Sequence, residues 1–192
     1  MFNDGRSKRV AFLAHCLLNQ NAISDGTAVY PAAFKSTLQV LLKEDIGVVQ
    51  LPCPELCCLG LDRGDEYGAE RPVTVENTRI RREMSAGKAA NRLAALVDYT
   101  MYQIEEYHRH GFELTVIVGV NRSPNCGVNT TSDSGIEVPG MGLYMSALRE
   151  RIETAGICIP IIGLKSDKDG VEKLLNILKN KSYHSLSFCR LI

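Results

Sequence analysis

LTVIVGV, residues Leu114–Val120, is the stretch of sequence that decides the fold. None of these residues is charged and most are β-branched, which is the pattern of a strand buried on both faces. Such strands belong to parallel sheets, because helices then cover both sides. Three other runs have the length and composition of a strand: Arg9–Ala14, Ile46–Leu51 and Cys158–Leu164. Pro160 cannot donate a hydrogen bond to a neighbouring strand, so we expect the last run at a sheet edge.

Amphipathic helical patterns separate these runs. Apolar residues recur at spacings of three and four, with polar residues between them. The four segments are Pro31–Lys43, Asn77–His110, Met141–Thr154 and Asp169–Leu178. The alternation of strands and helices predicts an α/β fold of three layers, similar to Rossmann and flavodoxin folds. Its core would be an open, mostly parallel sheet of about four to five strands with helices on both faces.

Length and charge limit the classes of function. The chain has 192 residues, with 22 Lys plus Arg against 22 Asp plus Glu, 6% aromatic residues and no Trp. One α/β domain over 1–192 is expected, in which 179–192 form a short strand or tail. The balanced charge argues against a nucleic-acid partner. The basic cluster on the long helix is therefore interpreted as a solvated face; it comprises Arg79, Arg81, Arg82 and Lys88.

No run approaches the roughly 20 apolar residues that cross a bilayer, so we expect a cytoplasmic protein without a membrane partner. Its oligomeric state is left open. The sequence contains seven cysteines, and this odd number fits poorly with a fully paired set of disulfides. Reduced cytoplasmic thiols need a role other than cross-linking. Cys158 and Cys189 are interpreted as packing residues, since free cysteine is commonly buried.

Three other cysteines follow three successive predicted strands. Cys16 comes after the first, Cys53 after the second and Cys126 after the third. Parallel sheets bind ligands outside the carboxyl ends of their strands, which are about 4.8 Å apart, so these thiols are expected to converge. Each lies in a predicted loop, and Pro52 and Pro54 are expected to bar a helix around Cys53.

Converged thiolates select zinc, copper(I) or an iron–sulfur cluster. Structural zinc sites usually take four ligands in two close pairs, a spacing that this trio lacks. Three thiolates on a cubane cluster would leave one iron open to substrate as a Lewis acid. Cys57 or Cys58 could instead close the fourth position, which would give a fully ligated carrier, sensor or metal-binding module. A metal-free flavodoxin-like domain is a further alternative, although no Gly-x-Gly-x-x-Gly follows the first strand.

The sequence around these cysteines resembles the thiouracil desulfidase (TudS-type) family. The family pattern is matched in order by CLL at 16–18, CPE at 53–55 and SPNCG at 123–127. The chain departs from that pattern at NQN, residues 19–21, and at GLDR, residues 60–63. These departures predict a divergent relative whose substrate need not be thiouracil.

The resemblance implies a [4Fe-4S] cluster held by Cys16, Cys53 and Cys126, and catalytic roles for Glu55 and Ser123. The implied activity is removal of sulfur from a small thiolated molecule, similar to a thio-nucleobase. Such a reaction needs an electrophile for sulfur, an activated water for carbon and a path for protons. Glu55 is the expected base for water. Ser123 is expected to orient the substrate or relay a proton.

Overall fold

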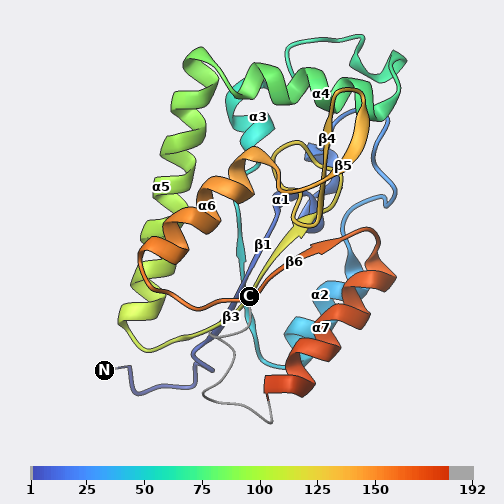
Figure 1. Ribbon diagram of the computed structural model, residues 1–192. Coiled ribbons are helices and arrows are strands. Elements are labelled where there is room, and N and C mark those ends of the chain that lie inside the picture. Colours follow the sequence, from blue (N-terminus) through green and yellow to red (C-terminus); the bar gives the residue numbers. More distant parts are fainter. Residues whose placement is uncertain (1, 182–192) are drawn as a thin grey trace.

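Four parallel strands form the central sheet of the computed structural model, which describes residues 2–181 (Figure 1). Their order across the sheet is β2-β1-β3-β6. Their bounds are Arg9–Leu13 for β1, Gly47–Gln50 for β2, Glu113–Val120 for β3 and Ile161–Leu164 for β6. The expected α/β class and the edge position of β6 are both confirmed.

β1 lies between β2 and β3 and sets the register of both. Leu13, its last residue, is opposite Gln50 of β2 and Val118 of β3. The pairing continues to the strand end, where Leu51 N donates to Leu13 O and Ala14 N donates to Val118 O, both at 2.8 Å. The chain runs from β1 to β2 on one side and then crosses back to β3 on the other. The order of the strands therefore reverses at β1, which is where open α/β sheets bind their ligands.

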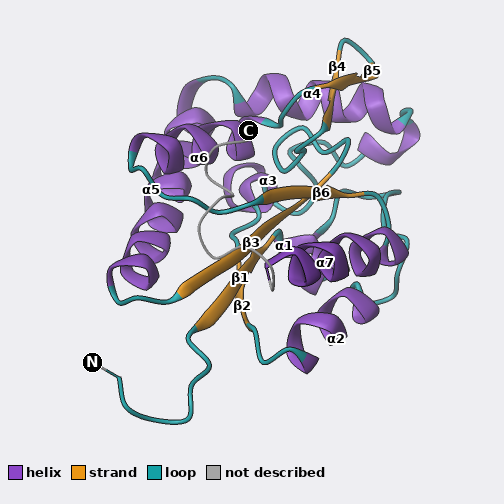
Figure 2. Ribbon diagram, turned by 60° about the horizontal axis from the view of Figure 1, so that its bottom comes forward, coloured by secondary structure: helices purple, strands orange, loops and turns teal. Residues whose placement is uncertain are grey.

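Helices cover both faces of this sheet (Figures 1 and 2). α2 (Lys35–Lys43) and α7 (Asp167–Lys181) pack together on one face. α5 (Gly87–Arg109) and α6 (Leu143–Thr154) pack together on the other. The central strands β1 and β3 are consequently buried on both sides, and Phe12 in β1 is fully inaccessible to solvent. None of the helices in the described residues is long and apolar enough to span a membrane.

The helical segment expected over Asn77–His110 is two helices. α4 comprises Val73–Met84, and α5 begins only at Gly87. Ala86 between them is extended, with φ −136° and ψ 161°, and Gly87 has a φ of 55°, so the helix cannot continue. The apolar spacing runs through the break and conceals it in the sequence. The break allows α4 to lie across the carboxyl edge of the sheet (Figure 1).

Two short helices begin where β1 and β2 end, although loops were expected there. They are α1 (His15–Leu18) and α3 (Pro54–Leu59). The expectation that the prolines bar a helix around Cys53 is wrong, because Pro54 occupies the first helical turn. Proline fits there, since its missing N–H would be unpaired anyway and its φ is already helical. Cys53 is the N-cap residue, and its Sγ accepts a hydrogen bond from Leu56 N at 3.5 Å.

A β-hairpin that was not predicted follows the third cysteine. Its strands are β4 (Thr130–Asp133) and β5 (Ile136–Pro139), which pair antiparallel. Ser134 and Gly135 form the turn with φ values of 50° and 77°, the left-handed pair typical of tight hairpins. The hairpin packs on α4, and Gly135 N donates to Thr78 Oγ1 at 3.0 Å. Strands this short and polar lack a clear sequence pattern.

β6 is shorter than the apolar run that predicted it. Pairing begins only at Ile161, after Pro160, whereas Cys158 lies outside the strand. Cys158 is exposed, so its interpretation as a buried packing residue is wrong. Cys189 lies outside the described residues. So does most of the expected tail over 179–192, whose first positions instead complete α7.

Asp167, at the start of α7, caps the start of α2. Its carboxylate accepts hydrogen bonds from Ser36 N at 2.9 Å and from Thr37 N at 2.8 Å, and Thr37 Oγ1 donates to it at 2.7 Å. Burial opposes the charged form, but these hydrogen bonds outweigh it and hold the pKa of Asp167 below its ordinary value of 3.8. The cap therefore joins the two helices of this face at their amino ends.

Replacing Asp167 with alanine should lower the free energy of unfolding by about 1 kcal/mol, because the first turn of α2 loses its acceptor. The folded pKa lies below the unfolded value, so this contribution is complete above the unfolded pKa and is lost as the pH falls through the folded one. Urea denaturation at neutral and at acidic pH measures the difference. Glu172→Ala, at an exposed position of the same helix, is the control. Equal losses in the two variants would contradict the capping role.

Candidate functional site

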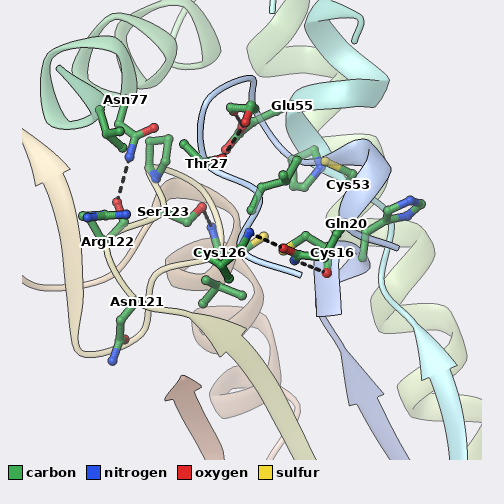
Figure 3. A pocket seen from close by; sticks show the side chains of 18 of the residues that line it. Cys16, Gln20, Thr27, Cys53, Glu55, Asn77, Asn121, Arg122, Ser123 and Cys126 are labelled. Atoms are coloured by element: carbon green, nitrogen blue, oxygen red, sulfur yellow. Dashed lines mark hydrogen bonds between the residues drawn. The ribbon is translucent and has the colours of Figure 1, made fainter. Parts of the chain in front are cut away.

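Three cysteines from three adjacent strand ends line one cavity (Figure 3). Cys16 is in α1 just beyond β1, Cys53 caps α3 just beyond β2, and Cys126 lies in the loop beyond β3. The cavity has a volume of about 220 Å³. Glu55 and Ser123 line it as well. The structure thus brings together all five of the residues to which the sequence assigned cluster binding or catalysis.

Polar side chains surround much of this cavity. The uncharged ones are Gln20, Ser24, Thr27, Asn77, Asn121 and Ser123. The acidic and basic ones are Glu55, His15, Arg63, Arg122, Glu137 and Lys165. Apolar side chains complete the wall, Val120 and Phe34 among them. A concave site with an apolar wall and several convergent polar groups is typical of small-molecule binding.

The backbone around each cysteine is held by hydrogen bonds. Gln20 Nε2 donates to Cys16 O at 2.7 Å, which fixes the turn after β1. Cys126 N donates to Ser123 Oγ at 2.9 Å, and Cys126 O accepts from Val120 N at 2.9 Å, which folds the loop back on β3. The Sγ of Cys53 has two donors, Leu56 N and the Arg63 guanidinium. The three thiols are therefore set in fixed surroundings.

Burial raises the pKa of all three thiols. The pKa of Cys16 is about 12, because burial disfavours the thiolate and the neighbouring Cys53 and Glu55 repel it. The pKa of Cys53 is about 11, again through burial first and then Glu55. Burial likewise raises the pKa of Cys126 well above 9.0, with added repulsion from Cys16 and Cys53. Three thiolates in one cavity would therefore require a bound cation.

The metal-binding donors of this cavity are soft sulfur atoms. Among residues 2–181, no group of three His, Cys, Asp or Glu side chains is close enough to hold one ion. The thiols of Cys16, Cys53 and Cys126 line a shared cavity. Soft sulfur donors are also the ligands that iron–sulfur clusters take.

Cys57 and Cys58, the predicted candidates for a fourth ligand, do not line the cavity. Both lie on α3 beyond its first turn. Cys57 is exposed to solvent. Cys58 packs against a small cluster that includes Ile80 and Met84 of α4. The helix therefore carries both side chains away from the site that its N-cap residue lines.

Glu55 is 7% exposed and receives hydrogen bonds from three separate segments. Arg63 Nε and Ser24 Oγ donate to its Oε2 at 3.2 and 3.1 Å. Asn125 Nδ2 donates to its Oε1 at 3.1 Å. Each carboxylate oxygen can accept two hydrogen bonds, and the described residues fill only one position on Oε1. The carboxylate is thus fixed in orientation and can still accept one further proton donor.

Asn125 is retained beside Glu55 at an energetic cost. Its side chain is fully buried, and its Oδ1 is the one buried side-chain polar atom in the described residues without a hydrogen-bond partner. An unpaired buried acceptor costs about 1–3 kcal/mol. The Nδ2 that reaches Glu55 is the evident reason for an asparagine at this position.

Ser123 organises the loop that carries Cys126. Its Oγ accepts hydrogen bonds from Asn125 N at 3.3 Å and Cys126 N at 2.9 Å. Its carbonyl oxygen accepts from Gly127 N at 3.2 Å and from Thr131 Oγ1 at 3.0 Å. The hydroxyl hydrogen has no acceptor within the described part of the chain. It is therefore available to a molecule in the cavity.

Two basic residues of α4 point inward, so the expectation of a wholly solvated face is wrong. Arg79 pairs with Glu76 at 2.6 Å and donates to Arg63 O at 2.9 Å. Arg81 Nη1 donates to Pro124 O at 3.3 Å. α4 thus fixes the loop of Arg63 and the loop of Cys126 together. The remaining two basic residues of the segment are exposed as expected, Arg82 and Lys88.

The sequence did not reveal the partners of Glu55. Ser24 lies 31 positions away and Asn125 lies 70 positions away, so neither forms a local motif with it. Arg63 is nearer, eight positions along, but sits in a loop rich in charge and glycine where an arginine suggests solvent exposure. These three residues reach Glu55 only because the fold brings their segments together around the buried carboxylate.

No known family model matches the chain. It is 26% identical over 174 residues to an uncharacterized protein of Methanocaldococcus jannaschii, across 91% of this chain and 97% of the relative. Among solved structures, a [4Fe-4S]-dependent thiouracil desulfidase, TudS, is similar with a TM-score of 0.44 and 16% identity, over 90% of this chain and 99% of that one. Both similarities are distant. The function of this protein is therefore inferred from the residues that line its own cavity.

In the reduced, metal-free protein, we expect iodoacetamide to modify Cys57 much faster than Cys16, Cys53 or Cys126 at neutral pH. Only the thiolate reacts, and burial disfavours it at the three cavity positions. Their rates should rise about tenfold per pH unit up to the raised pKa. Peptide mass spectrometry resolves each site, and the unfolded chain is the control. Cavity thiols reacting as fast as Cys57 would contradict this arrangement.

Proposed function

We propose that this protein is an iron–sulfur-dependent desulfidase that removes sulfur from a small thiolated molecule. One observation carries the proposal: three cysteines from three neighbouring strand ends line the same cavity as a buried, oriented carboxylate. The thiols supply soft ligands, and the carboxylate supplies a proton acceptor.

Cys16, Cys53 and Cys126 would hold a [4Fe-4S] cluster, whose fourth iron would supply a soft Lewis acid for a substrate sulfur. The overall reaction is hydrolytic: C=S and water become C=O and hydrogen sulfide, with no net transfer of electrons. The protein must therefore bind the thiocarbonyl compound, hold a water beside its carbon and move protons.

Glu55 is the proposed base for that water. Arg63 and Ser24 occupy its Oε2, whereas Oε1 has one hydrogen bond from Asn125 and one free lone pair. A water held at this lone pair would give its proton to the carboxylate as the oxygen adds to carbon. The fixed orientation of the carboxylate favours such a step, because the acceptor needs no rearrangement.

Ser123 and the nearby amides are proposed to orient the substrate. The Ser123 hydroxyl hydrogen can donate to a ring nitrogen or oxygen, and Asn121 and Asn77 line the same wall. The cavity of about 220 Å³ would contain the cluster as well as the substrate, and it is smaller than the pockets of about 300–1,000 Å³ that hold drug-sized ligands. Its size supports a small free molecule as substrate and gives no support to a nucleic-acid chain.

The alternative function is a fully ligated iron–sulfur carrier or sensor without catalysis. It needs a fourth protein ligand, and the two cysteines predicted for that role, Cys57 and Cys58, lie off the cavity. This arrangement favours a site with one open iron. The desulfidase is therefore the function that the geometry supports best.

Anaerobic reconstitution followed by iron and sulfide analysis tests the ligand set. Serine at Cys16, Cys53 or Cys126 should abolish stable cluster binding, since each removes one of three thiolates. Serine at Cys57 or Cys58 should leave four irons and four sulfides per chain, the content of a [4Fe-4S] cluster. An unchanged iron content in all three cavity variants would contradict the proposal. Loss of iron in the Cys57 or Cys58 variant would instead favour the fully ligated carrier or sensor.

Glu55→Gln should retain the cluster but lose sulfide release from thiolated bases by at least about 100-fold, the usual range for removal of a general base. The amide keeps the shape and part of the hydrogen bonding but cannot accept the proton. Sulfide release and iron content are measured on the same sample. Glu150→Gln, at an exposed position of α6 that does not line the cavity, is the matched control. Turnover at the wild-type rate in Glu55→Gln would remove this residue from the mechanism.

A further inference from the structure

Arg63 stands apart from the other cations of the protein. Among the described residues it is the only Lys, Arg or His that is buried, with 2% of its surface exposed. Its φ is 58°, a left-handed conformation that is unfavourable for a residue with a side chain. A buried charge on a strained backbone is retained only when its surroundings hold it firmly.

Backbone carbonyls hold one end of the guanidinium. Nη1 donates to Gly60 O at 2.9 Å and to Leu61 O at 3.0 Å, just beyond the end of α3. Nη2 donates to Ala22 O at 2.5 Å, in the segment after β1. Arg63 thereby joins the segment that follows Cys16 to the helix that Cys53 begins. Its position is fixed without help from Glu55.

The other edge of the guanidinium faces the proposed reaction site. Nε donates to Glu55 Oε2 at 3.2 Å, and Nη2 reaches Cys53 Sγ at 3.9 Å. One rigid planar group therefore contacts a proposed cluster ligand and the proposed base at once. Lysine could supply the charge but not this fork of donors.

α4 supports the strained backbone at Arg63. Arg79 Nη2 donates to Arg63 O at 2.9 Å, and Glu76 fixes Arg79 through hydrogen bonds of 2.6–3.1 Å. Arg71 also pairs with Glu76, at 2.9 Å. The ion-pair network of α4 thus ends on the residue that contacts Cys53 and Glu55.

We propose that Arg63 is a positioning residue that fixes Glu55 relative to Cys53 and supplies the positive charge beside that ligand. The inference rests on the proposed function, because it takes Cys53 as a cluster ligand. Hydrogen bonds to ligand sulfurs and nearby charge tune the reduction potential of a cluster. Loss of this N–H···S contact and its positive charge therefore moves the potential to more negative values, an effect that a purely structural residue would lack.

The test compares wild type, Arg63→Gln, Arg63→Lys and the exposed control Arg82→Gln after anaerobic reconstitution. Iron and sulfide content, the midpoint potential and circular dichroism are measured on each. Arg63→Gln should bind the cluster less stably and show a more negative potential. Arg63→Lys should keep the fold and the charge yet lose turnover, because Glu55 loses the Nε contact. Arg82→Gln should match wild type in every measurement.

The outcomes separate this inference from the proposed function. Wild type that binds no cluster overturns both. A cluster in wild type together with unchanged potential and turnover in Arg63→Gln overturns only the role of Arg63. If Arg63→Gln does not fold, Arg63→Lys decides: turnover and potential equal to wild type would overturn the inference.

Discussion

The position of β1 between β2 and β3 is the constraint on which the site depends. Parallel pairing brings the carboxyl ends of the three strands to one edge, about 4.8 Å apart from strand to strand. The chain leaves each strand within a few residues of a cysteine, so the three thiols have little freedom to separate. Thiols placed at the opposite ends of the same strands could not share a cavity. The covered faces of the sheet make this edge the natural opening to solvent.

Periodicity was sufficient to predict the sheet, because apolar runs such as Leu114–Val120 have no other plausible place in a folded chain. It was also sufficient for the convergence of the cysteines, since strand ends in a parallel sheet share an edge. The break at Ala86 and the helix starting at Pro54 escaped prediction, because backbone angles and capping decide them and apolar spacing does not. The hairpin escaped because its strands are held by α4 rather than by their own composition.

The chemistry of the site was predicted less completely than its location. Cysteine and glutamate can be assigned roles from their own side chains, whereas the role of Arg63 depends on which groups surround it. A buried guanidinium beside a carboxylate and a thiol is a property of three segments folded together. The same holds for Arg79 and Arg81, whose spacing on a helix suggests a solvated face. Hydrogen bonds to loops that are distant in the sequence direct these two side chains inward instead.

α3 has a mechanical consequence for the site. It carries Cys53 at its first cap and Glu55 within its first turn, and the loop at its other end returns Arg63 to both. Hydrogen bonds also join Glu55 to Ser24, in the segment after Cys16, and to Asn125, beside Cys126. The carboxylate is therefore the point at which the segments of all three cysteines are connected. A displacement of α3 would disturb the whole set of thiols and not Cys53 alone.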